Sequence, residues 1–113
     1  MACLIRADGT SEEFKWEGIK SFDDHIGDIA AAAPVSLHVG YSVYVDDSGL
    51  LKDLPRNAAA EELSQYQPLV GPALVVSYEE AGEDELLSLV HSEAKKLFEA
   101  RLGDIVSRGG PGP

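Results

Sequence analysis

The chain has 113 residues, which is enough for one hydrophobic core and too few for two. Its 20 Asp and Glu residues outnumber 9 Lys and Arg residues, and the formal net charge of -11 disfavours direct binding to nucleic acids and anionic membranes. Hydrophobic residues make up 44% of the sequence, a value typical of folded globular proteins rather than disordered chains.

The first half of the sequence predicts a hairpin, a helix and a strand. Apolar and alternating segments at residues 2–7 and 13–17 flank a polar turn, which is typical of a β-hairpin. We expect a helix that Ser21 caps and that extends to the end of the following alanine run. Strict alternation of apolar side chains then predicts a strand over residues 35–45, with a bulge or bend at Gly40.

The second half predicts two helices on either side of one buried strand. Leu50 is a candidate start for a return strand, and Asn57 is well placed to cap a short helix over residues 58–64. The nearly continuous apolar run at residues 73–78 favours a central strand that is covered on both faces. Apolar side chains at three- and four-residue steps predict one long amphipathic helix over residues 83–106.

These elements predict a single α+β domain over residues 1–108. Its small mixed β-sheet of about five strands is expected to pack against the long C-terminal helix, with two shorter helices beside it. The Gly- and Pro-rich residues 109–113 cannot pack and are expected to form a disordered tail. We expect a cytoplasmic protein, because the sequence shows neither a membrane span nor the pattern of a signal peptide.

Two segments resemble a known family. Residues 44–57 read YVDDSGLLKDLPRN and residues 70–76 read VGPALVV, and the opening residues 4–10, LIRADGT, fit the same pattern. They are similar to domain of unknown function 3846, a set of small proteins found mainly in phages, plasmids and actinobacterial genomes. The resemblance covers about the first 78 residues. It implies an accessory protein of a mobile element with no known enzyme activity and no catalytic residues to transfer.

One position departs from the family pattern. Asp53 stands where the family usually has glycine, the residue that most easily adopts a positive φ. The substitution predicts that the loop before Leu54 does not need a positive φ.

No group of residues in the sequence predicts catalysis. Cys3, the single cysteine, lies in an apolar segment with no neighbouring base, and it is therefore expected to be an inert core thiol. Adjacent carboxylates such as Asp46 and Asp47 point in different directions and do not form a catalytic pair. We expect no enzyme activity, no cofactor and no bound metal.

A rare pair of cations precedes the short helix that Asn57 opens. Lys52 and Arg56 lie four residues apart, and Ala58 begins a run of small side chains that would let an anion approach the free N–H groups of the helix start. These four residues are the candidate site for a phosphate or a nucleotide-derived ligand. The alternative is that Asn57 only caps the helix and the cations balance Asp53, Glu61 and Glu62, and capping is the more common role.

A second candidate is an acidic segment that could contact a basic protein. Its members are Glu79, Glu80, Glu83, Asp84 and Glu85. The alternative is a solvated loop before a helix that favours negative charge at its start. Charge, size and the lack of catalytic groups, together with the setting that the family resemblance implies, favour an accessory protein that binds a host or element protein as an inhibitor or modulator. The competing hypothesis is a protein that binds a small phosphate-bearing ligand.

The long helix also predicts a homodimer. Its apolar residues exceed what a small sheet can cover, and Leu89, Leu102 and Val106 could extend onto a second copy.

Overall fold

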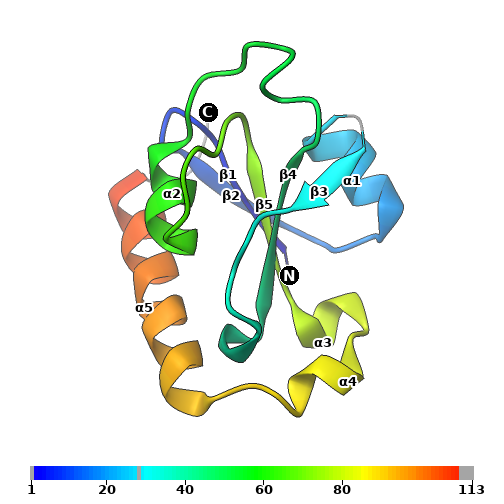
Figure 1. The fold of residues 1–113 in the computed structure, drawn as a ribbon, viewed down its shortest axis with the longest axis vertical. Coiled ribbons are helices and arrows are strands. Elements are labelled where there is room, and N and C mark those ends of the chain that lie inside the picture. Colours follow the sequence, from blue (N-terminus) through cyan, green and yellow to red (C-terminus); the bar gives the residue numbers. More distant parts are fainter. Residues whose placement is uncertain (1, 28, 110–113) are drawn as a thin grey trace.

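Five antiparallel strands form one sheet in the computed structural model, which describes residues 2–27 and 29–109 (Figure 1). The strands are β1 (Ala2–Ile5), β2 (Ser11–Phe14), β3 (Ala30–Ala32), β4 (Tyr41–Asp46) and β5 (Ala73–Ser77). Their order across the sheet is β2-β1-β5-β4-β3. The helices are α1 (Ile19–His25), α2 (Ala58–Ser64), α3 (Tyr78–Ala81), α4 (Asp84–Leu87) and α5 (Ser92–Gly109), and a 3-10 turn, η1, spans Leu37–Val39.

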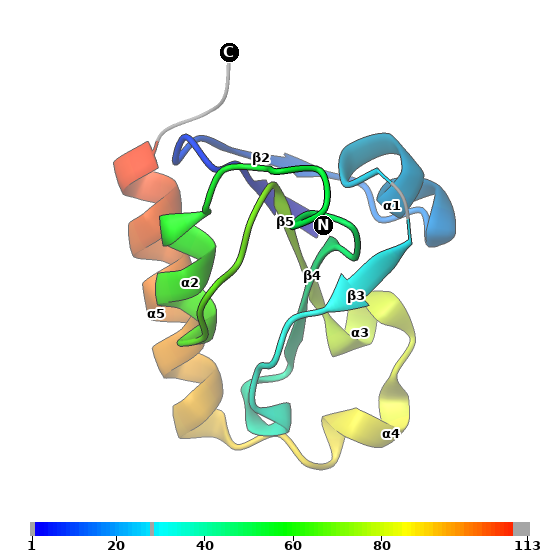
Figure 2. The same cartoon turned by 45° about the horizontal axis from the view of Figure 1, so that its top comes forward.

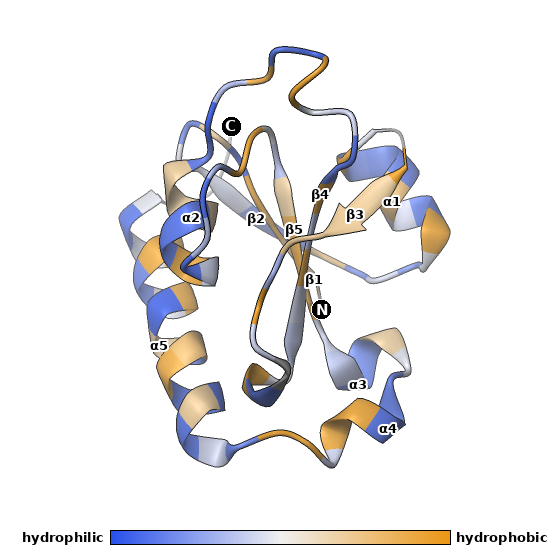
Figure 3. Cartoon of the chain, in the orientation of Figure 1, coloured by the Kyte–Doolittle hydropathy of each residue, from blue (hydrophilic) through white to orange (hydrophobic). Residues whose placement is uncertain are grey.

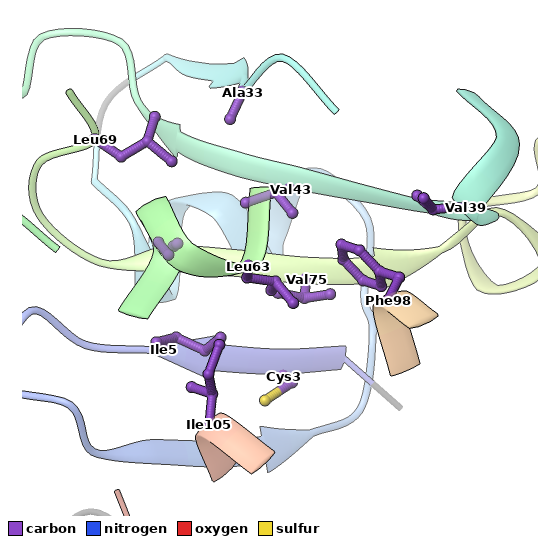
Figure 4. Packing of buried hydrophobic residues seen from close by; sticks show 12 residues of the cluster. Cys3, Ile5, Ala33, Val39, Val43, Leu63, Leu69, Val75, Phe98 and Ile105 are labelled. Carbon is purple, nitrogen blue, oxygen red and sulfur yellow. The ribbon is translucent and has the colours of Figure 1, made fainter. Parts of the chain in front are cut away.

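Helices cover both faces of the sheet, so the molecule has three layers (Figure 2). On one face, α2 and α5 pack against the larger core. On the other face, Phe22 of α1 and Ile26, the residue after it, pack near Leu74 and Val76 of β5. Figure 4 shows the larger core, where side chains of the central strands meet Leu63 of α2 and Phe98 of α5. This packing confirms the expected α+β architecture with a long C-terminal helix.

Several predicted elements are confirmed. β1 and β2 form the N-terminal hairpin, and β5 lies in the middle of the sheet between β1 and β4. Asn57 caps α2, because its side-chain oxygen accepts a hydrogen bond from the Ala60 N–H at 3.0 Å. The sheet was expected to be mixed, and that detail is wrong: β5 runs antiparallel to both of its neighbours, so the described pairings are all antiparallel.

The predicted boundaries of the first helix are wrong. α1 begins at Ile19, and the hydroxyl of Ser21 accepts a hydrogen bond from the Glu17 N–H at 2.8 Å from within the first turn. The helix ends before Gly27, whose φ of 121° falls outside the helical region. The alanines that follow form β3 and pair with β4, since tertiary pairing overrides even the high helix propensity of alanine in a run this short.

The strand expected over residues 35–45 is shorter than predicted. Residues 37–39 form η1, and Gly40 makes the expected bend with a φ of 77° before β4 begins at Tyr41. Leu50 does not begin a return strand, because residues 47–53 form a turn with Leu50 strongly exposed.

The prediction for Asp53 is also wrong, since its φ is 55°. The loop does need a positive φ at this position, and aspartate is one of the few residues besides glycine that adopts it readily.

The single helix expected over residues 83–106 is broken in two. α4 ends at Leu87 and α5 begins at Ser92. The linker instead contacts η1: the His91 N–H donates to the His38 carbonyl at 3.0 Å, and the His38 ring lies 2.8 Å from the Leu89 carbonyl. Of the predicted tail, Gly109 is the last residue of α5, and residues 110–113 lie outside the described residues.

Among the described residues, no helix combines the length and the apolar character that crossing a membrane requires.

Neighbouring positions on α5 allow a direct test of the packing. Phe98 is 1% exposed and Leu97 is 65% exposed. Phe98→Ala is expected to lower the free energy of unfolding by about 3–5 kcal/mol, because it opens a cavity in the core. Leu97→Ala should change it by about 0.5 kcal/mol or less. Urea denaturation of the two variants would measure this difference, and equal losses would contradict the orientation of α5.

Candidate functional site

Lys52, the first predicted ligand residue, forms an ion pair with a buried carboxylate. Its Nζ donates to Oδ2 of Asp46 at 2.9 Å, and Oδ1 of Asp46 accepts the Ser48 N–H at 2.8 Å. The bond from Lys52 holds the pKa of Asp46 below its usual value, although burial acts in the opposite direction. Gly27 lies directly against this pair: a β-carbon there would come within 3.0 Å of the Asp46 carboxylate.

Arg56, the second predicted cation, binds a different carboxylate. Its Nε and Nη2 donate to the two oxygens of Glu61 at 3.1 and 3.0 Å, and Nη2 also donates to Gln67 at 3.1 Å. Glu61 is buried, and its Oε2 accepts the Leu69 N–H at 3.0 Å. This bidentate Arg56–Glu61 ion pair therefore holds the start of α2 against the chain segment that leads into β5.

Asn57 is fully buried and all of its side-chain groups have partners. Its Nδ2 donates to the carbonyls of Ile5 and Gly71, both at 2.9 Å, and Oδ1 accepts the Ala60 N–H. Its backbone N–H donates to the Leu69 carbonyl at 2.7 Å. One residue thus joins α2, the end of β1 and the approach to β5.

Ala58, the fourth predicted residue, borders a surface cavity. The cavity measures about 490 Å³ and lies between α2, the end of α5 and the turn of the N-terminal hairpin. Arg108 also lines it and forms ion pairs with Glu62 and Asp104. Lys52 and Arg56 are not among the residues that line this cavity, so the structure does not bring the predicted cations together around it.

The predicted acidic segment lies on α3, α4 and the bend between them. Glu79 and Glu80 occupy the first turn of α3, and Asp84 and Glu85 occupy the first turn of α4; all four are exposed. Glu83 is half-buried, and its buried Oε2 has no hydrogen-bond partner among the described residues.

Burial first, and the charge of Glu83 second, raise the pKa of Tyr78, whose side chain is buried at the start of α3.

One group important for these sites, the buried carboxylate of Asp46, was missed by sequence reasoning. Asp46 and Glu61 are buried carboxylates, and each binds one of the predicted cations. Glu61 was one of the acids expected to balance the cations, and it binds Arg56. Asp46 lies six residues before Lys52, a spacing that signals no contact without knowledge of the turn between them. Within residues 2–27 and 29–109, no group of three or more His, Cys, Asp or Glu side chains is arranged to hold a metal ion.

The partners of Asn57 predict a large effect for its removal. Asn57→Ala should lower the free energy of unfolding by roughly 2–4 kcal/mol, since it removes a helix cap and leaves two buried carbonyls unpaired. The matched control is Ser77→Ala, which removes only the cap of α3, a bond of 3.2 Å to the Glu80 N–H. We expect about 1 kcal/mol from the control in urea denaturation, and an equal loss from both variants would refute the joining role of Asn57.

The Asp46–Lys52 pair predicts a dependence on pH. Because the pKa of Asp46 is lower in the folded state, its contribution is fully present above about pH 4, the unfolded value, and is lost as the pH falls through the folded value. The urea midpoints of the wild type and Asp46→Asn should therefore differ most near neutral pH and converge in acid. The control is Asp104→Asn, at an exposed ion pair worth little. If the difference in urea midpoint between wild type and Asp46→Asn stays constant with pH, the Asp46–Lys52 ion pair does not contribute to stability.

The comparison with protein families gives one result. The family model described as domain of unknown function (DUF3846) matches residues 2–101, which extends beyond the segments that carry the resemblance and into α5. No curated protein and no solved structure matches the chain. Since the model covers most of the sequence, the chain belongs to the DUF3846 family.

Proposed function

We propose that this chain is a non-enzymatic accessory protein of a phage or another mobile element. In this proposal it acts in the cytoplasm and binds a host or element protein, which it inhibits or modulates. The supporting observation is an exposed surface on α3, α4 and the residues just after α4, where acidic side chains lie beside two leucines. We call it the acidic surface and define it by Glu79, Glu80, Asp84, Glu85, Leu87 and Leu89.

The first argument is where the positive charges lie. Of the nine Lys and Arg residues, five form ion pairs with carboxylates elsewhere in the described chain. These five are Arg6, Lys20, Lys52, Arg56 and Arg108. No ion pair in the described residues neutralises Glu79, Asp84 or Glu85. The negative potential of these three carboxylates is therefore open to a basic partner.

The second argument is apolar area inside the charged region. Leu87 is 37% exposed and Leu89 is 44% exposed, and both follow directly after the acids of α4. Figure 3 shows hydrophobic and hydrophilic residues next to each other along α4. An apolar centre with a charged rim is the usual organisation of a protein interface, and the negative rim favours a partner with Lys or Arg around an apolar side chain.

The predicted homodimer through α5 stays a prediction, with a changed contact surface. Leu102 and Val106 are partly buried against the core, so they offer little area to a second copy. Leu97 of α5 and Leu89 in the linker before α5 are both exposed and could contact a second copy. A second copy would also bring two chains of net charge -11 together, which disfavours the contact.

The predicted phosphate site at Lys52, Arg56, Asn57 and Ala58 also stays a prediction. Both cations are engaged by buried carboxylates, and the Asn57 side chain is fully satisfied within the chain. These positions favour the structural alternative, in which the residues hold the loop and the start of α2.

The proposal is tested by neutralising the acidic surface. The variant carries Glu79→Gln, Glu80→Gln, Asp84→Asn and Glu85→Gln. The matched control removes the same charge from four exposed acids elsewhere, with Glu13→Gln, Glu17→Gln, Asp53→Asn and Glu93→Gln. We expect immobilised wild type and control to retain the same host protein from a lysate at low salt, with salt weakening the contact, and the surface variant to lose it. Retention by the surface variant, or equal loss from both variants, would exclude the acidic surface as the binding site.

A further inference from the structure

One edge of the sheet offers backbone groups for pairing. In the β3–β4 ladder, the Asp47 N–H donates to the Ile29 carbonyl and the Ala33 N–H donates to the Val43 carbonyl, so odd-numbered residues of this segment bond β4. Ala30 and Ala32 have the opposite phase, and their N–H and C=O groups point away from β4. Since β3 is the last strand of the sheet, these groups form an edge without a neighbouring strand among the described residues.

The two edges of the sheet are protected to different degrees. The outer strand at the other side, β2, carries Glu12 and Glu13 within four residues, and charged side chains deter pairing with a further strand. β3 consists of three alanines, which offer no charge and no bulk against an approaching backbone. Pro34, the next residue in phase with Ala32, has no N–H, so the usable edge is short.

A groove begins where β3 begins. It measures about 690 Å³ and lies between α1, the start of β3 and the turn after β4. Ile19 and Ile29, which line it, are 76% and 79% exposed. Phe22 and Ala30 add further apolar wall. A strand added to the edge could place an alternate side chain in this groove, as in other domains that bind peptides by strand addition.

The charge of the groove indicates what kind of segment would fit. Its two charged lining residues, Asp23 and Asp47, are both carboxylates, and both are exposed. A second copy of the chain would bring the same carboxylates face to face across a two-fold axis, and like charges there oppose pairing. Lys or Arg beside an apolar residue would complement them.

We propose that β3 is a docking edge for an extended segment of a partner protein, which carries apolar residues and Lys or Arg. The segment pairs with the backbone of Ala30 and Ala32 and places an apolar side chain between Ile19 and Ile29. This site goes beyond the acidic surface and lies at the other end of the sheet: α3 follows the end of β5, whereas the groove adjoins the end of β4, and these two strands are antiparallel.

The test selects displayed short random peptides on the full chain and compares two variants at one position. Ala32→Pro removes the outward N–H, a change that edge strands tolerate. Ala32→Val keeps the N–H and suits a strand. We expect the selected peptides to alternate apolar residues with Lys or Arg and to bind Ala32→Pro about tenfold more weakly than Ala32→Val or wild type. In NMR spectra of the protein, the backbone amide signals that shift when the peptide binds should be those of residues 29–32. Equal affinity for the two variants would overturn the proposal.

A second probe leaves the protein unchanged, in case Ala32→Pro does not fold. The selected peptide is synthesised with its pairing amides N-methylated, which should abolish binding if the backbone of the peptide bonds β3. Unchanged binding would overturn the proposal in favour of a groove that takes only a side chain or small apolar ligand. Pairing of β3 with a second copy, seen as a dimer that Ala32→Pro dissociates, would overturn it too.

Two further variants separate this site from the acidic surface. The variant with Glu79→Gln, Glu80→Gln, Asp84→Asn and Glu85→Gln should bind the peptide like wild type, whatever it does to capture from a lysate. The double variant with Asp23→Asn and Asp47→Asn should bind the peptide several-fold more weakly at low salt. If the four-residue variant loses peptide binding and the variant with Asp23→Asn and Asp47→Asn keeps it, the peptide binds the acidic surface and the docking edge is overturned.

Discussion

The amide of Asn57 is the contact on which the arrangement of this fold depends. It caps α2 and at the same time bonds carbonyls at the end of β1 and before β5. A side chain of this kind can be buried only if each polar atom finds a partner, because a buried amide without hydrogen bonds is costly. The position of α2 over the sheet is therefore tied to the spacing between these two strands, and the neighbouring Arg56–Glu61 pair holds the same junction.

Features that depend on local chemistry could be predicted from the sequence. The cap at Asn57, the bend at Gly40 and the buried strand before Tyr78 each follow from one residue type or one apolar run. Features that depend on distant partners could not. Ala30–Ala32 pairs as a strand because β4 lies beside it, and the helix expected after Glu83 breaks because the linker bonds η1.

In the candidate sites, too, the contacts that depend on distant partners were harder to predict than the residues themselves. Sequence reasoning found Lys52 and Arg56 because cations are rare in this chain, and it named Glu61 among their balancing acids, but it did not find the buried Asp46 that binds Lys52. Acidity thus serves two separate purposes here. A few carboxylates are buried and fix loops, whereas the exposed carboxylates of α3 and α4 lie in the first turns of these helices, where negative charge favours the helix and also faces solvent. The difference between these groups directs attention to the exposed ones as a binding surface.

The position of Cys3 has a consequence for how the molecule opens. This thiol lies on β1, next to the central strand, and burial followed by the charge of Glu13 raises its pKa to about 11. A thiol that is both covered and protonated is a poor nucleophile, so alkylating reagents react with it only when α5 moves away from this face of the sheet. Because it is the single cysteine, its rate of labelling in native buffer is a site-specific record of that opening, and no engineered probe is required.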